Sequence, residues 1–409
     1  MNFVEIAREM DSQDVLVGFR DEFVIDDPEL IYLDGNSLGR LPKRTALMMR
    51  EVVDRQWGER LVRGWSEGWV DLPRRVGAKI ARLIGAQEDE VLVCDSTSIN
   101  FYKLTMAALE VQSGRKQIVT DSGNFPSDVY LLQGCAKQFG HTIDIVEPEV
   151  VAAALNAQTA LLTLSHVSFK SGFIQPMDIL TKAAHEAGAL TLWDLSHSVG
   201  AIPIDLNGAG ADLAVGCTYK YLNGGPGAPA FLYVRKDLQE KLLNPIWGWF
   251  GQKNAFDFSL EYTPADGLQR FMAGTPPILS LAAVEYGVDL ILEAGIDRLR
   301  AKSIRQTEFL IELWEAFLEP HGFTLNSPRD SRHRGSHVSF GHPDAFRIDQ
   351  ALIHDMNVVP DFRTPDNIRF GVTPISTTFT ELVDAVLRTR RVVDDRLFEK
   401  YSAERAGVT

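Results

Sequence analysis

The middle of the chain alternates between short apolar runs and helix-like segments, and this alternation constrains the fold more than any other feature. Apolar runs rich in β-branched residues occur at 117–120, 142–146, 159–164, 190–193, 213–215 and 231–234. Helix-like segments, such as 150–157 and 177–187, lie between several of them. This alternation predicts an α/β fold with a mainly parallel sheet that carries helices on both faces. The nearly continuous apolar character of the runs is typical of strands buried on both sides.

The pattern changes after Pro277. A long helix is expected over 278–294, and a second helix-like run leads from Asp297 towards Phe317. The remainder mixes short strands with a closing helix from Thr380, which is typical of a small α+β domain. Because 409 residues exceed what one compact core usually holds, we predict three parts: an N-terminal segment 1–40 that packs near the small domain, a large domain 41–277, and a linking helix with the small domain 278–409.

The charge balance excludes some classes of partner. The chain carries 41 Lys and Arg against 55 Asp and Glu, a net charge of −14. Nucleic acids and anionic membrane surfaces bind basic faces, so neither is an expected partner, whereas a small-molecule enzyme fits this balance. The three cysteines, Cys94, Cys135 and Cys217, cannot all pair within one chain, and the N-terminus lacks an apolar signal core. We therefore expect a cytoplasmic protein, and no metal site.

The segment Thr-Tyr-Lys-Tyr-Leu-Asn-Gly-Gly-Pro-Gly, residues 218–227, is the most informative motif. Its Lys220 follows the apolar run 213–215 and precedes a glycine-rich turn, where open α/β sheets form their ligand crevice. A lysine that forms a Schiff base must be partly desolvated so that its amine can be neutral. The alternative is a surface lysine before a loop, and this segment alone leaves that alternative open.

Trp-Asp-Leu-Ser-His, residues 193–197, lies at the end of another apolar run. Asp194 is suited to keep a pyridinium nitrogen protonated, which makes a pyridoxal ring a stronger electron sink. His197 could hydrogen-bond around such a cofactor. An aspartate here can also simply cap the next helix, but its place upstream of the strand and Lys220 favours the cofactor interpretation.

Two further segments offer groups for a phosphate and for a flat ring. In the Asp-Ser-Thr-Ser-Ile-Asn segment, Thr97 and Ser98 precede a helical run, and the N-terminus of a helix binds phosphate well. Ordinary helix capping would need only one such hydroxyl. In Gly-Asn-Phe-Pro-Ser-Asp, residues 123–128, Phe125 could stack on a flat ring and Asp128 could add a second carboxylate near its nitrogen. A plain turn is the alternative for this segment.

Aromatic and arginine side chains suit a substrate pocket. The aromatic residues of 246–251 and 271–277 could line a pocket for an aromatic substrate, although Trp and Phe more often pack in the core. A guanidinium fork is the best holder of an α-carboxylate. Arg369 is the first candidate because it lies on a strand-like run, and rigid elements position donors better than loops. Arg363, on a turn, is the second candidate, and a surface ion pair is the alternative for either.

Together these motifs resemble those of bacterial kynureninases, pyridoxal-5′-phosphate (PLP) enzymes of the aspartate-aminotransferase fold type, fold type I. The likeness runs from Tyr-Leu-Asp-Gly-Asn-Ser-Leu-Gly (32–39) to the Ile-Arg pair at 368–369 and so covers most of the chain. The ordered set of GNFPSD, WDLSHSVGAIP, TYKYLNGGPG, WGWFG and GTPPI is far more specific than any single motif. The resemblance implies a large domain with a seven-stranded type of sheet, a smaller α+β domain, and a homodimer with its active site at the subunit interface.

The resemblance also implies a reaction and a set of site residues. Kynureninases cleave the Cβ–Cγ bond of L-kynurenine with water, giving anthranilate and L-alanine in tryptophan catabolism. Lys220 would bind PLP and then move protons, while Asp194 and Asp128 would pair with the pyridine nitrogen. The further cofactor contacts implied are Thr97, Ser98, Phe125, Pro126, Ser127, Ser165, His197, Tyr219, Trp249 and, from the partner subunit, Thr275. The substrate contacts implied are Arg369, Trp65, Asn36 and Phe250. We also expect Tyr219 to serve as the acid–base group at the substrate carbonyl, and Trp65 favours plain L-kynurenine over 3-hydroxykynurenine.

Other functions share this fold. A cysteine desulfurase or selenocysteine lyase needs a nucleophilic cysteine on a mobile loop in its C-terminal part, but all three cysteines here precede Lys220. An aminotransferase shares the early chemical steps and stays a second alternative. A regulator that kept the cofactor and lost activity is a third, and the joint presence of Lys220, Asp194 and Arg369 argues against it.

Overall fold

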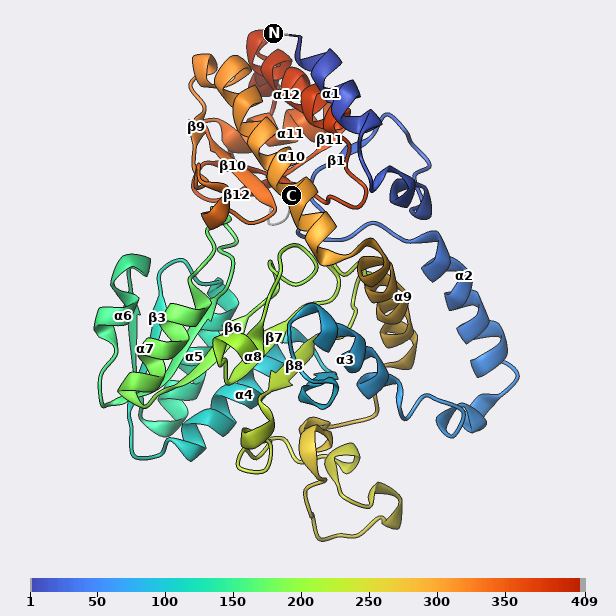
Figure 1. Ribbon diagram of the computed structural model, residues 1–409, viewed down its shortest axis with the longest axis vertical. Helices are drawn as coiled ribbons and strands as arrows, with labels where there is room; N and C mark the ends of the chain where they lie inside the picture. Colours follow the sequence, from blue (N-terminus) through green and yellow to red (C-terminus); the bar gives the residue numbers. More distant parts are fainter. Residues whose placement is uncertain (1, 405–409) are drawn as a thin grey trace.

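The computed structural model describes residues 2–404. Its large domain is built on a seven-stranded sheet of order β2-β8-β7-β6-β5-β3-β4 (Figure 1). Strands β4, β3, β5, β6 and β7 are parallel, and β8 is antiparallel to both of its neighbours. The strands are β2 (Val91–Val93), β3 (Gln117–Asp121), β4 (Thr142–Val146), β5 (Thr159–Ser165), β6 (Leu190–Asp194), β7 (Leu213–Gly216) and β8 (Phe231–Val234). The predicted α/β fold with a mainly parallel sheet is confirmed.

Helices cover both faces of this sheet. Every residue of the inner strands β3, β5, β6, β7 and β8 is buried, whereas β4 at the edge is partly exposed. One face packs against α4 (Thr97–Val111) and α5 (Pro126–Phe139). The opposite face packs against α3 (Leu72–Leu83), α7 (Met177–Ala187) and α9 (Ile278–Ala294). The apolar runs in the sequence are therefore strands between two helical layers.

The helix predicted over 150–157 is shorter than expected. Helix α6 spans Val151–Ala154 only, because Leu155 is extended and the Asn156 side chain accepts a hydrogen bond from the backbone N–H of Gln158. The remaining short helices of the large domain are α2 (Lys43–Glu51) and α8 (Leu206–Ala209).

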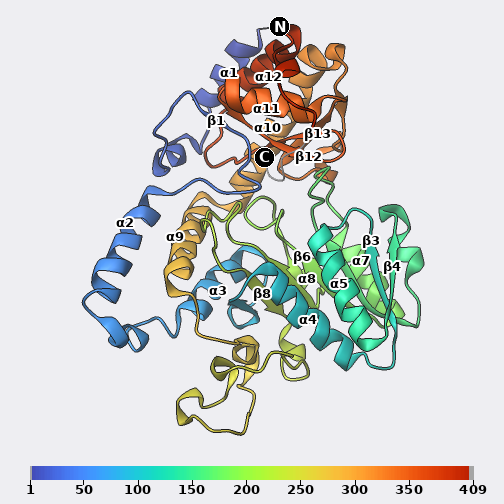
Figure 2. The ribbon, with the colours of Figure 1, turned by 180° about the vertical axis from the view of Figure 1, so that it is seen from behind.

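A smaller domain is formed by the C-terminal part of the chain. Its four-stranded antiparallel sheet, of order β12-β13-β10-β9, consists of β9 (Thr324–Leu325), β10 (His337–Gly341), β12 (Asp361–Arg363) and β13 (Asn367–Gly371). Helices α10 (Ile296–Phe317), α11 (Ala345–Asp355) and α12 (Phe379–Asp394) accompany the sheet (Figure 2).

The N-terminal segment lies against this smaller domain. Helix α1 (Phe3–Ser12) packs on α12, and β1 (Ile31–Tyr32) pairs in parallel with β11 (Val358–Val359). Ala7, Ile31 and Leu33 are part of the small-domain core. The exact boundaries, 40/41 and 277/278, stay a prediction. Within residues 2–404, none of the helices combines the length and the apolar character needed to cross a membrane.

Candidate active site

Lys220 follows β7 at the carboxyl ends of the parallel strands. Ser165, Asp194 and Val215 are neighbours across β5, β6 and β7, so the polar residues that end these strands meet at one edge of the sheet. The Lys220 amine lies 3.0 Å from Nε2 of His197. Burial, followed by the charge of Lys220, lowers the pKa of His197 well below its ordinary value. The imidazole is therefore neutral and can accept a hydrogen bond from the amine.

The turn around Lys220 is held by the backbone and by the N-terminal motif. The N–H of Gly224 donates to the carbonyl of Thr218, and that of Asn223 donates to the carbonyl of Lys220, both at 2.9 Å. The N–H of Gly39 donates to the carbonyl of Tyr219 at 2.8 Å. A Cβ at Gly39 would lie 2.4 Å from the Lys220 carbonyl oxygen, so only glycine permits this approach.

A pair of buried carboxylates lies near Lys220. Asp194 and Asp128 are 6% and 3% exposed. Burial and then the charge of Asp194 raise the pKa of Asp128 well above its ordinary value. One Asp194 oxygen accepts from the backbone N–H of Ser196 at 2.8 Å, while Oδ2 of Asp128 is buried without a hydrogen-bond partner among the described residues. Two facing carboxylates of this kind are suited to a ligand that brings an N–H group.

The N-termini of two helices meet beside these carboxylates. Ser98 lies in the first turn of α4 and Ser127 in the first turn of α5, and their hydroxyl oxygens are 3.3 Å apart. Thr97 is the first residue of α4, and Pro126 is the first of α5. Both helix dipoles thus present their positive ends and free N–H groups to one place, which favours an anion.

Phe125 presents an exposed ring next to this anion-binding place. It is 40% exposed, and its edge-to-face partner is Phe169, with ring centroids 5.2 Å apart. Asn124 fixes the loop, because its side-chain oxygen accepts from Ser165 Oγ at 2.8 Å and its amide donates to Thr120 Oγ1 at 2.9 Å. Sequence reasoning quoted Asn124 within its motif but gave it no role.

Arg369 lies on β13 with its side chain 1% exposed. Its Nη1 donates to the carbonyl of Phe169 at 2.6 Å and its Nη2 to Ser37 Oγ at 2.9 Å, and it forms an ion pair with Asp361. With its amide oxygen turned towards the arginine, Asn36 accepts from Nε at 2.9 Å. The predicted substrate residues Arg369 and Asn36 are therefore in contact.

The expectation that Arg363 lies on a turn is wrong. Arg363 is the last residue of β12, because it pairs with Asn367 across the antiparallel ladder and leaves the turn to the residues between them. Its Nη1 forms an ion pair with Asp361, and its side chain is 30% exposed. Sequence reasoning gave no role to Asp361, Asp34 and Ser37, which surround the two arginines. Asp34 and Ser37 lie within the quoted 32–39 motif, and Asp361 lies two residues before Arg363.

Four predicted site residues lie apart from Lys220. Among residues 2–404, no hydrogen bond or ring contact joins Trp65, Trp249, Phe250 or Thr275 to Lys220, Asp194 or Arg369. Trp249 and Trp65 instead contact Phe250, with ring centroids 4.5 and 6.1 Å away. Figures 1 and 2 show the segment 246–275 at the end of the large domain opposite to the small domain.

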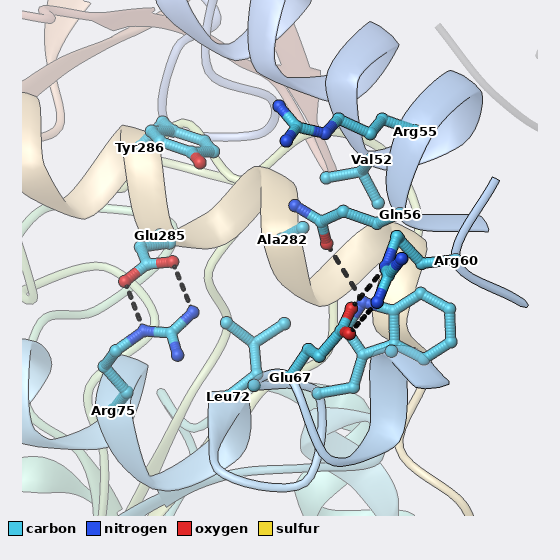
Figure 3. A pocket seen from close by; sticks show the side chains of 13 residues that line it. Val52, Arg55, Gln56, Arg60, Glu67, Leu72, Arg75, Ala282, Glu285 and Tyr286 are labelled. Carbon is cyan, nitrogen blue, oxygen red and sulfur yellow. Dashed lines mark hydrogen bonds and ion pairs between the residues drawn. The ribbon is translucent and has the colours of Figure 1, made fainter. Parts of the chain in front are cut away.

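A surface pocket near Trp69 does not resemble a substrate site. It has a volume of about 240 Å³ and lies between α9 and the segment that follows α2 (Figure 3). Several of its charged side chains pair with one another, as Arg75 does with Glu285 and Arg60 with Glu67. Among the described residues, no cluster of three or more His, Cys, Asp or Glu side chains is placed to hold a metal ion.

All three cysteines are free and buried. Burial raises the pKa of the Cys94 and Cys135 thiols to about 11 and raises that of Cys217. A thiol with a raised pKa is a poor nucleophile at neutral pH. These thiols are therefore unsuited to desulfurase chemistry.

Comparison with known proteins places the chain in a family. Residues 31–357 match the family model described as aminotransferase class-V. The kynureninase of Pseudomonas fluorescens is 46% identical over 94% of both chains, and that of Burkholderia mallei is 41% identical over 99% of both. Among solved structures, a cysteine desulfurase of Thermococcus onnurineus shares the fold with a TM-score of 0.77 at 19% identity, covering 95% of this chain and 98% of its own. The cysteine desulfurase CsdA of Escherichia coli does so with a TM-score of 0.77 at 15% identity, covering 92% and 99%. The chain therefore belongs to the kynureninase family, a family of PLP-dependent enzymes within the class-V aminotransferases.

Proposed function

We propose that this chain hydrolyses the Cβ–Cγ bond of L-kynurenine to anthranilate and L-alanine, with PLP bound through Lys220. The proposal is carried by one group of neighbouring residues, which combines a lysine amine, a buried carboxylate pair and an enclosed arginine, in a chain similar to kynureninases along nearly its whole length. The desulfurase alternative lacks this support, because the thiols are buried and the desulfurase structures share the fold alone.

The residues of the crevice fit PLP. The unpartnered Oδ2 of Asp128 and the carboxylate of Asp194 suit a protonated ring nitrogen. The hydroxyls of Ser98 and Ser127, at two helix N-termini, suit the phosphate. The exposed ring of Phe125 suits a planar partner. Ser165, His197 and Thr97 would complete the cofactor contacts.

Each protein group has a distinct task in the reaction. When bound, PLP supplies an electron-poor ring that stabilises negative charge on the reacting carbon. Lys220 takes the proton from the substrate α-carbon and returns it. The phenol of Tyr219 donates a proton to the substrate carbonyl oxygen. Arg369 binds the α-carboxylate, and Asp194 keeps the cofactor nitrogen protonated.

Turnover of purified protein tests this function. We expect anthranilate fluorescence to appear with L-kynurenine, and borohydride reduction followed by peptide mapping to find the pyridoxyl label on Lys220. Lys220→Ala is the control and should release no anthranilate. Label on another side chain, or wild-type protein that produces no anthranilate, would contradict the proposal. Comparison of kcat/KM for L-kynurenine and 3-hydroxykynurenine tests the preference that Trp65 favours.

We infer that the active site is completed by a second copy of the chain. Trp65, Trp249, Phe250 and Thr275 are expected at the site, yet the segment 246–275 lies at the far end of the large domain. This segment exposes large apolar side chains: Trp247 is 63% exposed, Phe258 74% and Leu260 105%. Apolar surface of this kind favours a protein partner, and a homodimer would bring the segment to the other Lys220.

Complementation between two inactive variants tests this sharing. Lys220→Ala removes the amine, and Thr275→Asp places a charge where the partner's cofactor phosphate would bind. If sites are shared, mixed dimers have one intact site, so co-refolding equal amounts should restore about a quarter of wild-type activity. Each variant refolded alone should stay inactive. A mixture without activity, or a monomer by light scattering, would contradict the shared site.

We also propose that the enzyme acts in the cytoplasm. Three unpaired cysteines suit a reducing compartment. Fractionation of the native cells with an antibody against the chain would test this location.

A further inference from the structure

The two candidate arginines of the carboxylate site share one carboxylate. Asp361 lies directly across the antiparallel ladder from Arg369, and Arg363 lies two residues along the same strand. Side chains at these positions project from the same face of the sheet. One oxygen of Asp361 therefore pairs with Arg369 and the other pairs with Arg363.

The N-terminal motif closes this cluster. Ser37 Oγ accepts from Nη2 of Arg369 at 2.9 Å and lies 3.2 Å from the Asp361 carboxylate. Nη2 of Arg363 lies 3.5 Å from the same hydroxyl. Arg369 has its Nε, Nη1 and Nη2 atoms all engaged by the chain, whereas Arg363 is partly open to solvent. Neither guanidinium can turn without breaking the contacts of Asp361.

Positive charge exceeds negative charge in the cluster of Arg369, Arg363 and Asp361. Two guanidinium groups face one carboxylate, that of Asp361. Asp34 is the next acid, 3.8 Å from Arg369, and burial followed by the charge of Asp361 raises its pKa to about 7. Asp34 is thus mostly protonated below pH 7 and about half ionised at pH 7. The remaining positive charge is shared by the buried Arg369 and the partly exposed Arg363, and it suits one incoming carboxylate.

We propose that Asp361 is the positioning residue of the substrate-carboxylate site, where it holds Arg369 and Arg363 as one unit. The inference rests on the proposed function only in naming kynurenine as the ligand. Loss of Asp361 would leave two guanidinium groups that repel each other. The geometry of the arginine pair would then be lost.

The variant Asp361→Asn keeps the shape of the side chain and tests the inference. We expect KM for L-kynurenine to rise about tenfold, with kcat within about twofold, because the lost contact orients a charge-assisted hydrogen bond. Arg363→Gln, at a partly exposed position, should raise KM in the same direction. The KM of the double variant should be no higher than that of Asp361→Asn alone, because both residues act through one unit.

Two ligands that differ only in a carboxylate distinguish a role of Asp361 in positioning the arginines from a general loss of structure. L-Alanine and ethylamine differ by one carboxylate, and both can be titrated on the holoenzyme by its absorbance, without turnover. We expect Asp361→Asn to lower the affinity for L-alanine about tenfold relative to wild type and to leave the affinity for ethylamine unchanged. If both ligands weaken equally, Asp361 has only a structural role. If Asp361→Asn binds L-alanine as tightly as wild type or more tightly, Asp361 does not position the arginines.

The outcomes also distinguish this inference from the proposed function. Wild-type protein that binds L-alanine through the cluster but releases no anthranilate would contradict the function and support the inference. If wild type is active and the affinities of Asp361→Asn and Arg363→Gln for these ligands are unchanged, the function is supported and the inference is contradicted.

Discussion

At the residue scale, the surroundings of Tyr219 set its protonation. Its neighbour Cys217 and its burial raise the pKa of the phenol above its ordinary value. The phenol therefore stays protonated throughout the neutral range and can act as a proton donor. Its ring lies beside the Lys220 amine, with Nζ 6.0 Å from the ring centroid.

Replacing Tyr219 with Phe should lower kcat for L-kynurenine by about a hundredfold with little change in KM, because the ring remains and only the proton donor is lost. Anthranilate fluorescence gives both constants. The absorbance of the bound cofactor serves as control and should match that of wild type. Wild-type turnover in Tyr219→Phe would remove the phenol from this role.

His166 makes folding sensitive to acid. Burial lowers the pKa of its imidazole from 6.5 to about 4. Between pH 4 and pH 6.5 the unfolded chain binds a proton at His166 that the folded chain does not bind. The contribution of the neutral imidazole to folding stability is therefore fully present above pH 6.5 and is lost as pH falls through the folded pKa. A shift of this size corresponds to about 3 kcal/mol. The thermal midpoint of wild type should fall more steeply below pH 6.5 than that of His166→Gln. If the two midpoints fall in parallel with pH, this account is contradicted.

At the element scale, the paired N-termini of α4 and α5 form the phosphate end of the site. A negative charge at Ser98 would repel the phosphate dianion and would itself occupy the positive ends of the two helix dipoles. Ser98→Asp should therefore lose bound PLP on desalting, as measured by cofactor absorbance per chain. Ser113→Asp adds the same charge beyond the other end of α4, at an exposed position, and should retain the cofactor. If both variants retain equal amounts of PLP, the paired N-termini of α4 and α5 do not bind its phosphate.

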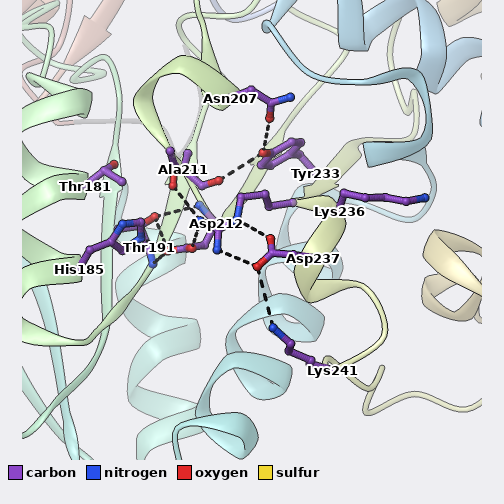
Figure 4. Close-up of polar contacts among 12 residues, drawn as sticks. Thr181, His185, Thr191, Asn207, Ala211, Asp212, Tyr233, Lys236, Asp237 and Lys241 are labelled. Carbon is purple, nitrogen blue, oxygen red and sulfur yellow. Dashed lines mark hydrogen bonds and ion pairs between the residues drawn. The ribbon is translucent and has the colours of Figure 1, made fainter.

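Another cluster joins α7, β6, β7 and β8 around Asp212 (Figure 4). Asp212 accepts from the backbone N–H of Thr191 at 2.8 Å and pairs with His185 and Arg235, each at 2.8 Å. The hydrogen bond to Asp212 raises the pKa of His185 above 6.5. Its stabilisation is therefore fully present below pH 6.5 and is lost as pH rises through the raised value.

His185→Gln should lower the thermal midpoint at about pH 6 and reduce the decline of that midpoint towards pH 8. Calorimetry across this range gives the comparison. Lys182→Gln, at an exposed position of the same helix, is the control and should follow the wild-type curve. An alkaline decline in His185→Gln equal to that of wild type would contradict the pairing.

At the scale of the whole molecule, local patterns predicted the fold better than they predicted the site. The alternation of apolar runs identified the sheet, and the helices over 177–187 and 278–294 have the bounds expected. Each of these depends on residues that are close in sequence. The cluster around Arg369 depends on Ser37, Phe169 and Asp361, which are far apart in the chain, and no local pattern links them.

The aromatic segment 246–275 illustrates a different limit. Its residue types suit a pocket for an aromatic ring, and its sequence indicated that role. A single chain, however, places this segment at the end of the large domain opposite to the small domain (Figure 1). Residue type can suggest what a side chain binds, but the subunit to which it contributes depends on assembly.

The contact between Gly39 and the turn of Lys220 has a consequence for biosynthesis. The segment containing Gly39 also pairs with strand β11, and its Leu33 carbonyl accepts a hydrogen bond from the N–H of Gly371. It therefore joins distant parts of the chain. A growing polypeptide on the ribosome cannot make these pairings until the residues up to Gly371 have emerged. The segment that contacts the turn of Lys220 can therefore reach its final place only once β11 and β13 have been synthesised.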